Sequence, residues 1–304
     1  MRITRRKVLR GAAGLGATFV FGRAWAATEM DLGDLRITTL SDGHLQLPES
    51  FLIGGLPQDE ARAILDAAGV AAGGYEPPCN VTLLLSGTDV VLFDAGAGPG
   101  FMQSTGQLLE ALAALDLTPD DITHVVFTHG HPDHLWGAID NFDEPLFANA
   151  RHLIGRIERD YWTNPETLES IGAERQSFAA GAARRIELLA DRLETFEDGD
   201  EVLPGVVARA SFGHTPGHMS FEIGDGRALV AGDAIGNAHL AFARPEWPMP
   251  ADQEPEQAAR ARLSLLQELA EREVPLIGFH LPAGGMGSVK KNGDAYAFVP
   301  GGSF

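Results

Sequence analysis

A short histidine-rich run, Thr128-His-Gly-His-Pro-Asp-His134, is the feature that most restricts how this chain can fold. Imidazole and carboxylate groups are the ligands that suit Zn²⁺ and its first-row neighbours. A single helix face could not gather four of them from this run, because the spacing would scatter the side chains around the helix. A loop must therefore carry the four candidate ligands, which are His129, His131, Asp133 and His134.

This loop is expected at the end of a buried strand. Residues 122–128 before it are apolar and rich in β-branched side chains, and residues 135–139 after it can open a helix. Alternate side chains of a strand-like turn point the same way, so the His-x-His pair can face one ion while the Asp-His pair turns towards a second. Three more candidate ligands follow in the second half of the chain: His218, Asp233 and His280.

The order of these motifs resembles the metallo-β-lactamase fold superfamily. The resemblance rests on His-x-His-x-Asp-His followed by Gly213-His-Thr-Pro-Gly-His218, Gly232-Asp233 and Gly278-Phe-His280, and it runs from about residue 35 to the C-terminus. It implies an α/β (α+β, four-layer) fold, the αββα sandwich, with two divalent metal ions per chain. Zinc is the expected metal, and nitrogen and oxygen ligands also accept manganese, iron or cobalt.

The resemblance also implies a role for each ligand. One metal would be held by His129, His131 and His218, the other by Asp133, His134 and His280, and Asp233 would bridge them. Asp94, at the end of an apolar strand, resembles the family's aspartate that supports a ligand histidine from the side away from the metal. His214 is expected to order its turn rather than to bind metal.

Two metals about 3.5 to 4 Å apart can hold a bridging hydroxide at neutral pH, which makes water the nucleophile. Asp133 is the expected catalytic residue, because a carboxylate that binds metal through one oxygen can orient the hydroxide and take up its proton. A covalent nucleophile is not expected, since the sequence has no Gly-x-Ser-x-Gly elbow and its single cysteine, Cys79, has no cationic neighbour. Cys79 is expected to be a small buried hydrophobe.

The bridging aspartate narrows the resemblance to one branch. β-Lactamases of this fold typically have cysteine or serine near that place, whereas lactonases, arylesterases, glyoxalase II and methyl parathion hydrolase carry aspartate. Glyoxalase II needs basic residues for glutathione, and the C-terminal part holds only Lys290 and Lys291. The methyl parathion hydrolase branch and its lactonase and arylesterase relatives are the most similar, which implies lactones, aryl esters or organophosphate triesters as substrates. A β-lactamase, a glyoxalase II-like thioesterase, a non-catalytic metal-binding protein and a redox di-iron protein are the alternatives.

An apolar pocket wall is expected beside the metals, because such substrates are partly apolar. The candidates are aromatic residues near the ligand loops: Trp136, Tyr161, Phe242 and Trp247. The last two rank first, since irregular segments at strand ends are where pockets are built.

The N-terminus resembles a twin-arginine export signal. It has the Arg5-Arg6 pair, a Gly/Ala-rich stretch too short for a stable membrane span, and an Ala24-Trp-Ala26 cleavage site. Residues 1–26 are therefore expected to be removed, and residues 27–304 to form a single hydrolase domain. The mature protein would be periplasmic or secreted, with the export machinery as a partner.

The charge balance argues against polyanionic partners. Loss of residues 1–26 removes six positive and no negative charges, so the formal net charge of −19 becomes about −25. Such a field repels nucleic acid and anionic membrane surfaces. A small neutral ester or lactone is the expected partner, and a homodimer is compatible with the sequence.

Hydrophobic periodicity predicts strands and helices in two successive halves. Besides residues 122–128, the expected strands are residues 35–40, 80–85, 89–93, 152–154, 206–211, 219–223 and 228–231. The expected helices are residues 57–68, 104–115, 166–190 (broken near Gly172 or Gly181) and 255–272.

Overall fold

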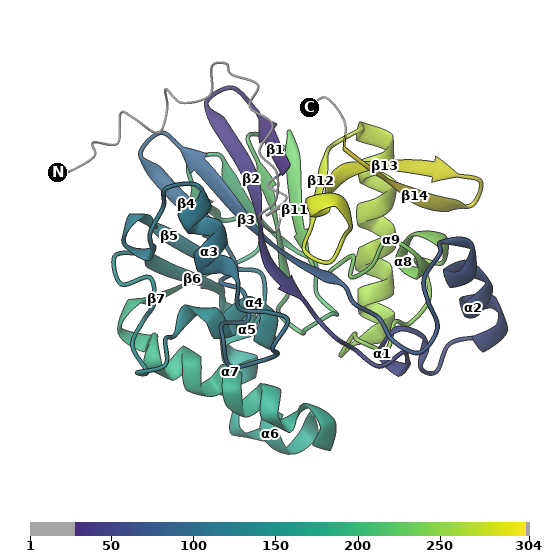
Figure 1. The fold of residues 1–304 in the computed structure, drawn as a ribbon, viewed down its shortest axis with the longest axis horizontal. Helices are drawn as coiled ribbons and strands as arrows, with labels where there is room; N and C mark the ends of the chain where they lie inside the picture. Colours follow the sequence, from purple (N-terminus) through teal and green to yellow (C-terminus); the bar gives the residue numbers. More distant parts are fainter. Residues whose placement is uncertain (1–27, 302–304) are drawn as a thin grey trace.

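Two seven-stranded sheets pack face to face in the computed structural model, which describes residues 28–301 (Figure 1). The expected export signal lies outside the described residues. The first sheet contains, in spatial order, β1 (Thr28–Asp31), β2 (Leu35–His44), β3 (Pro78–Ser86), β4 (Asp89–Phe93), β5 (His124–Phe127), β6 (Arg151–Gly155) and β7 (Leu193–Phe196). The second sheet has the spatial order β14 (Ala295–Pro300), β13 (Met286–Asn292), β12 (Leu276–Gly278), β11 (Ala228–Gly232), β10 (Met219–Ile223), β9 (Val206–Ala210) and β8 (Glu201–Leu203).

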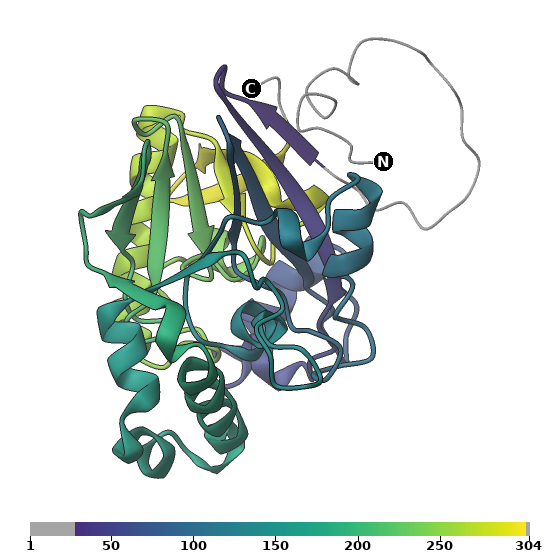
Figure 2. The same ribbon diagram turned by 90° about the vertical axis from the view of Figure 1, so that its left-hand side faces the viewer.

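Helices cover the outer faces of both sheets. The first sheet is covered by α3 (Leu108–Ala114), α4 (Pro132–Leu135), α5 (Arg156–Thr163) and α7 (Gln176–Leu188), and α6 (Pro165–Ser170) packs against α5 and α7. The second sheet is covered by α1 (Ser50–Ile53), α2 (Gln58–Ala67), α8 (Leu240–Ala243) and α9 (Pro255–Arg272). Figures 1 and 2 show α9 along the outer side of the second sheet, away from the first. None of the helices within residues 28–301 is long and apolar enough to cross a membrane.

Three hydrophobic cores hold these four layers together. Successive side chains of a strand point to opposite faces, so Leu83 of β3 packs beneath the helices while Leu84 faces the second sheet. The middle core joins the two sheets, with Phe93 of β4 in contact with Phe221 of β10 at a ring-centroid distance of 5.1 Å. The third core lies between the second sheet and α9. The predicted αββα sandwich is therefore confirmed.

The expected elements differ from the observed ones mainly in the helices. Helix α9 has the expected bounds. The expected helix 166–190 is two helices, broken at Gly172, whose φ is +93°, whereas Gly181 lies inside α7. Periodicity did not indicate α5 or the β13–β14 hairpin, because short elements carry too few apolar positions for a pattern.

The strand directions bring the ligand loops to one edge. Strands β4 to β7 are parallel to one another, and so are β11 and β12. Parallel neighbours end on the same side of a sheet, so the loops that follow them lie close together. These loops carry Asp94 after β4, residues 129–134 after β5, Asp233 after β11 and His280 after β12.

Candidate metal centre

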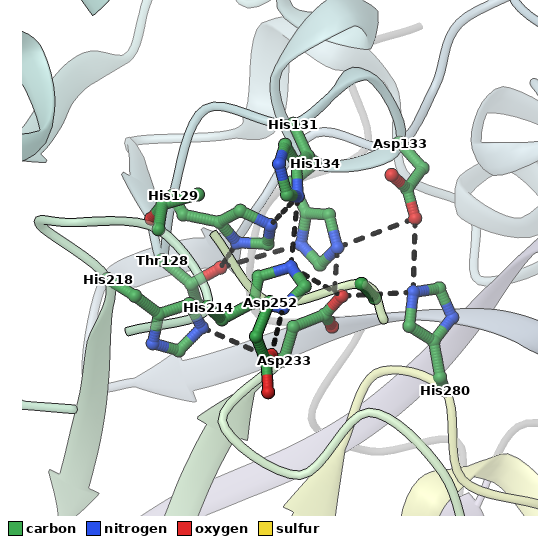
Figure 3. Close-up of polar contacts among 12 residues, drawn as sticks. Thr128, His129, His131, Asp133, His134, His214, His218, Asp233, Asp252 and His280 are labelled. Atoms are coloured by element: carbon green, nitrogen blue, oxygen red, sulfur yellow. Dashed lines mark hydrogen bonds and ion pairs between the residues drawn. The ribbon is translucent and has the colours of Figure 1, made fainter. Parts of the chain in front are cut away.

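Three imidazole nitrogens converge beside the loop after β5. His129 Nε2 lies 3.0 Å from His131 Nδ1, which in turn lies 2.9 Å from His214 Nε2 (Figure 3). Burial lowers the pKa of His129 and His131 well below the usual range, and the positive charge that neighbouring imidazoles could carry lowers it further. A neutral imidazole offers a nitrogen lone pair, so these three atoms have the chemistry and spacing to hold one divalent ion.

The structure corrects the expectation for the two histidines of the Gly213-His-Thr-Pro-Gly-His218 motif. His214, which was expected only to order the turn, completes the first group, and the assignment of His218 to that group is wrong. His218 is fully buried, and both of its ring nitrogens are engaged elsewhere. Its Nε2 accepts the backbone N–H of Asp233 at 2.9 Å, and its Nδ1 lies 2.8 Å from Ser211 Oγ.

Gly213 explains the path of this loop. Its φ is +129°, and a Cβ there would lie 2.1 Å from the backbone nitrogen of Ala258 in α9. The backbone N–H of Glu254 donates to the Gly213 carbonyl at 2.8 Å, which ties the loop to the start of α9. Only glycine fits this close approach, and the next residue along the chain is His214.

A second group gathers carboxylates with imidazoles. Asp133 Oδ2 lies 3.5 Å from His134 Nε2 and 3.2 Å from His280 Nε2. Within residues 28–301, Asp133 Oδ2, His134 Nε2 and Asp233 Oδ1 are buried without a hydrogen-bond partner. A buried polar atom without a partner lowers the stability of the folded protein, and a divalent cation bound among these three atoms would give each of them a partner. These residues therefore fit a second metal ion.

Asp233 lies between the two groups. Its Oδ1 is 3.4 Å from His134 Nε2, and its Oδ2 is 3.2 Å from His280 Nε2 and 3.4 Å from His214 Nε2. Burial acts to lower the pKa of His134 and His280, but the nearby carboxylates outweigh it and raise the pKa well above the usual range. The negative charge that holds protons on these rings would equally attract divalent cations.

Carboxylates behind the rings orient two of the histidines. Asp94 Oδ2 lies 2.8 Å from His134 Nδ1, which is where the sequence placed it. Sequence reasoning missed Asp252, whose Oδ1 lies 3.1 Å from His214 Nδ1 and whose Oδ2 accepts from the buried Arg262 at 3.1 Å. Such outer partners fix which ring nitrogen faces the metal.

Cys79 lies beside the second group. It is fully buried, as expected, and its sulfur falls within one candidate cluster with Asp133 and His280. Burial raises the pKa of the Cys79 thiol to about 12, so the group is a neutral thiol rather than a thiolate.

A cavity of about 310 Å³ opens on both groups. Its wall is largely apolar and aromatic, with Leu47, Phe51, Phe101, Phe178 and Met249 among the lining residues. At the metal end it is lined by His131, Asp133, His214, Asp233 and His280. The site thus combines an apolar wall with polar groups at one end, which is the usual construction of a small-molecule pocket.

The prediction of the pocket aromatics is wrong for all four residues, since none is among the described residues that line the cavity. The guanidinium carbon of Arg185 lies over the Trp136 ring, 4.2 Å from the ring centroid. The Tyr161 hydroxyl donates to Gln253 Oε1 at 2.6 Å. Phe242 is buried against Phe298, and Trp247 packs on the third core. Much of the aromatic wall, including Phe51, Phe101 and Phe178, comes from segments distant in sequence from the ligand loops.

Substitution of His214 and of His218 tests which of the two histidines belongs to the first group. We expect His214→Ala to lower the metal content from about two ions per chain to about one, because it removes one of three nitrogens in the first group. His218→Asn is the control and should retain both ions. Plasma emission on protein purified without chelator measures both variants, and the opposite pattern would contradict the assignment.

Known proteins share these features. Residues 74–278 match the metallo-beta-lactamase superfamily. Metallo-beta-lactamase domain-containing protein 1 of Xenopus laevis is 30% identical over 233 residues, which cover 72% of this chain and 79% of that protein. N-acyl homoserine lactonase AttM of Azorhizobium caulinodans is 37% identical over 136 residues, which cover 44% of this chain and 47% of AttM. The chain spans only 47% to 62% of the length of the first three curated relatives it matches.

Two solved structures share the fold over almost their whole length. One is AidC, a dizinc quorum-quenching lactonase in complex with a product, with a TM-score of 0.85, 23% identity, and 91% of this chain and 97% of that chain covered. The other is the hydrolase AbOPH, with a TM-score of 0.84, 24% identity, and coverage of 92% and 99%. At these identities the likeness concerns the fold alone. The match to residues 74–278 covers more than half of the sequence, and the chain belongs to the metallo-beta-lactamase superfamily.

Proposed function

We propose that this chain is a dinuclear metal-dependent hydrolase of lactones, with neutral aryl esters and organophosphate triesters as further substrates. The observation that carries the proposal is the apolar cavity that ends on buried carboxylate and imidazole atoms without partners in the described part of the chain. The lactonases AttM and AidC among its relatives and structural neighbours support a lactone substrate.

Seven residues would hold the two ions. The first group is His129, His131 and His214, the second is Asp133, His134 and His280, and Asp233 lies between them. Two divalent ions held by these residues would lower the pKa of a water molecule and polarise the carbonyl or phosphoryl oxygen of a substrate. Zinc is the metal we propose, because AidC is a dizinc enzyme, and the same ligands accept manganese, iron or cobalt.

Asp133 is the residue that we assign to proton transfer. It lines the cavity, and its Oδ2 lies among the ligand atoms, 3.2 Å from His280 Nε2. Attack of water forms a new C–O bond and releases a proton, and breakage of the ester C–O bond leaves an alkoxide. The Asp133 carboxylate can take up the proton and return it to the alkoxide.

Asn237 presents a hydrogen-bond donor to the same cavity. Its Oδ1 accepts the backbone N–H groups of His239 and Ala241, each at 3.1 Å, so the amide NH₂ must point away from them. The residue is 6% exposed and lines the cavity, and no described residue accepts from its Nδ2. A donor held in this way can bond to the negative charge that develops on a substrate oxygen.

The charge of the cavity favours neutral substrates. Apart from the candidate ligand histidines, Arg175 and Arg262 are the only basic side chains among the described residues that line it, and Arg262 is paired with Asp252. A substrate with several carboxylates, such as a glutathione thioester, would find few cations outside the metal centre. The strongly acidic composition of the chain adds to this bias.

The choice of substrate can be measured directly. We expect kcat/KM for a neutral N-acyl lactone or aryl ester to exceed that for a β-lactam or a glutathione thioester by at least about tenfold, which corresponds to about 1.4 kcal/mol. A substrate panel on metal-loaded protein makes the comparison. The proposal fails if a β-lactam or thioester is preferred tenfold over every lactone and aryl ester.

Asn237→Asp tests the donor. The carboxylate can still accept the two backbone N–H groups, but the NH₂ donor is lost, so kcat should fall about 100-fold. Asn237→Ala removes both functions and is the comparison. If the aspartate variant kept the full rate and only the alanine variant lost it, Asn237 would serve merely to hold the backbone before α8.

We further propose that the protein is exported by the twin-arginine route. Arg5→Lys together with Arg6→Lys should trap the precursor in the cytoplasm, because the export machinery reads the arginine pair rather than its charge. Fractionation of cells that carry a reporter fused after Ala27 measures the effect. A reporter that still reached the periplasm would indicate another route.

A further inference from the structure

Glu158 of α5 is a fully buried carboxylate that lies outside both ligand groups. Its Oε1 accepts the backbone N–H of Gly130 at 2.8 Å and the indole N–H of Trp162 at 2.6 Å. Its Oε2 accepts the hydroxyl of Thr215 at 2.7 Å and the backbone N–H of Gly217 at 3.0 Å. One side chain therefore satisfies four donors.

Three of these donors, Gly130, Thr215 and Gly217, belong to the two loops that supply the first group of histidines, whereas Trp162 lies in α5 itself. Gly130 stands between His129 and His131, and Thr215 directly follows His214. The first loop follows β5 of one sheet and the second follows β9 of the other. Glu158 thus forms hydrogen bonds to both loops. The separation of these loops sets the distance of the His214 nitrogen from the nitrogens of His129 and His131.

The surroundings of Glu158 are closely packed. A Cβ at Gly130 would lie 2.4 Å from Trp162 Nε1, and a Cβ at Gly217 would lie 2.2 Å from the backbone nitrogen of Glu158. Both glycines let the loops approach α5 closely enough to bond. Burial raises the pKa of Glu158, and the four hydrogen bonds act in the opposite direction. Three of the partners are N–H groups that can only donate, so the arrangement suits a carboxylate that accepts from all of them.

We propose that Glu158 is a positioning residue for the first metal, which acts by holding the histidine loops of both sheets at the separation that the metal requires. Asp94 contacts His134 of the second group directly and reaches His129 of the first group only through the Thr128 hydroxyl. The two carboxylates should therefore act chiefly on different ions. This inference rests on the proposed metal centre.

The test measures metal affinity and does not depend on a substrate. Zinc binding to metal-free protein is followed by competition with a chromophoric chelator, and the first-metal step is identified as the one lost in His214→Ala. We expect Glu158→Gln to raise the dissociation constant of that step about 10- to 100-fold and to leave the other step unchanged. Asp94→Asn should show the converse.

Two further variants separate positioning from folding. Thr215→Val removes one donor to Glu158 and keeps the shape of the side chain, so it should raise the dissociation constant of the first-metal step by less than Glu158→Gln does. This milder variant keeps the test available if Glu158→Gln does not fold. Asp160→Asn makes the same type of change at a half-exposed site of α5 and is the control that should alter neither step. Thermal unfolding of the metal-free variants reports the effect on folding alone.

The outcomes are distinguishable. The inference is overturned if Glu158→Gln and Thr215→Val lower the unfolding temperature but leave both dissociation constants unchanged. It is also overturned if they raise both dissociation constants equally, because Glu158 would then stabilise the fold without positioning the first metal. If the unsubstituted protein binds fewer than two ions, the proposed metal centre fails and this inference fails with it.

Discussion

The carboxylate of Asp233 between two sets of imidazoles is the contact on which the rest of the site depends. It lies 3.2 to 3.4 Å from nitrogens of His134, His214 and His280, which belong to both groups. A buried carboxylate costs several kcal/mol unless positive charge surrounds it, so Asp233 requires cations on both sides. His218 accepts the backbone N–H of the same residue, so this buried ring contacts the main chain at Asp233 and none of the carboxylate oxygens.

The layered fold supplies the rigidity that such a contact needs. Asp233 follows a central strand of one sheet, and the His-x-His loop follows a central strand of the other. The middle core joins these sheets through buried apolar side chains, so the two loops cannot slide relative to each other without opening that core. Sites carried at the ends of packed strands are held more precisely than sites on long loops.

The resemblance of the motifs to a known superfamily, together with residue types and local spacing, predicted the fold and indicated most of the candidate ligands that the structure brings together. The candidate ligands within residues 128–134 must lie close together in space, because they are close in sequence and directly follow a strand. The choice between His214 and His218 could not be made in this way, since both stand in one motif. It depends on the contact of Gly213 with α9, which is distant in sequence. The preceding residue gave no signal, because a glycine stands directly before each of the two histidines and each glycine lies against another part of the backbone.

The cavity wall was not predictable for a related reason. Phe51 and Phe178 reach the same cavity from segments that lie far before and after the first ligand loop, and periodicity within each segment says nothing about their meeting. Trp136 and Tyr161, close to the ligands in sequence, instead pack or bond behind the loops. Proximity along the chain therefore pointed to Trp136 and Tyr161, which lie behind the ligand loops, whereas the aromatic side chains Phe51 and Phe178 are brought to the cavity by the tertiary fold.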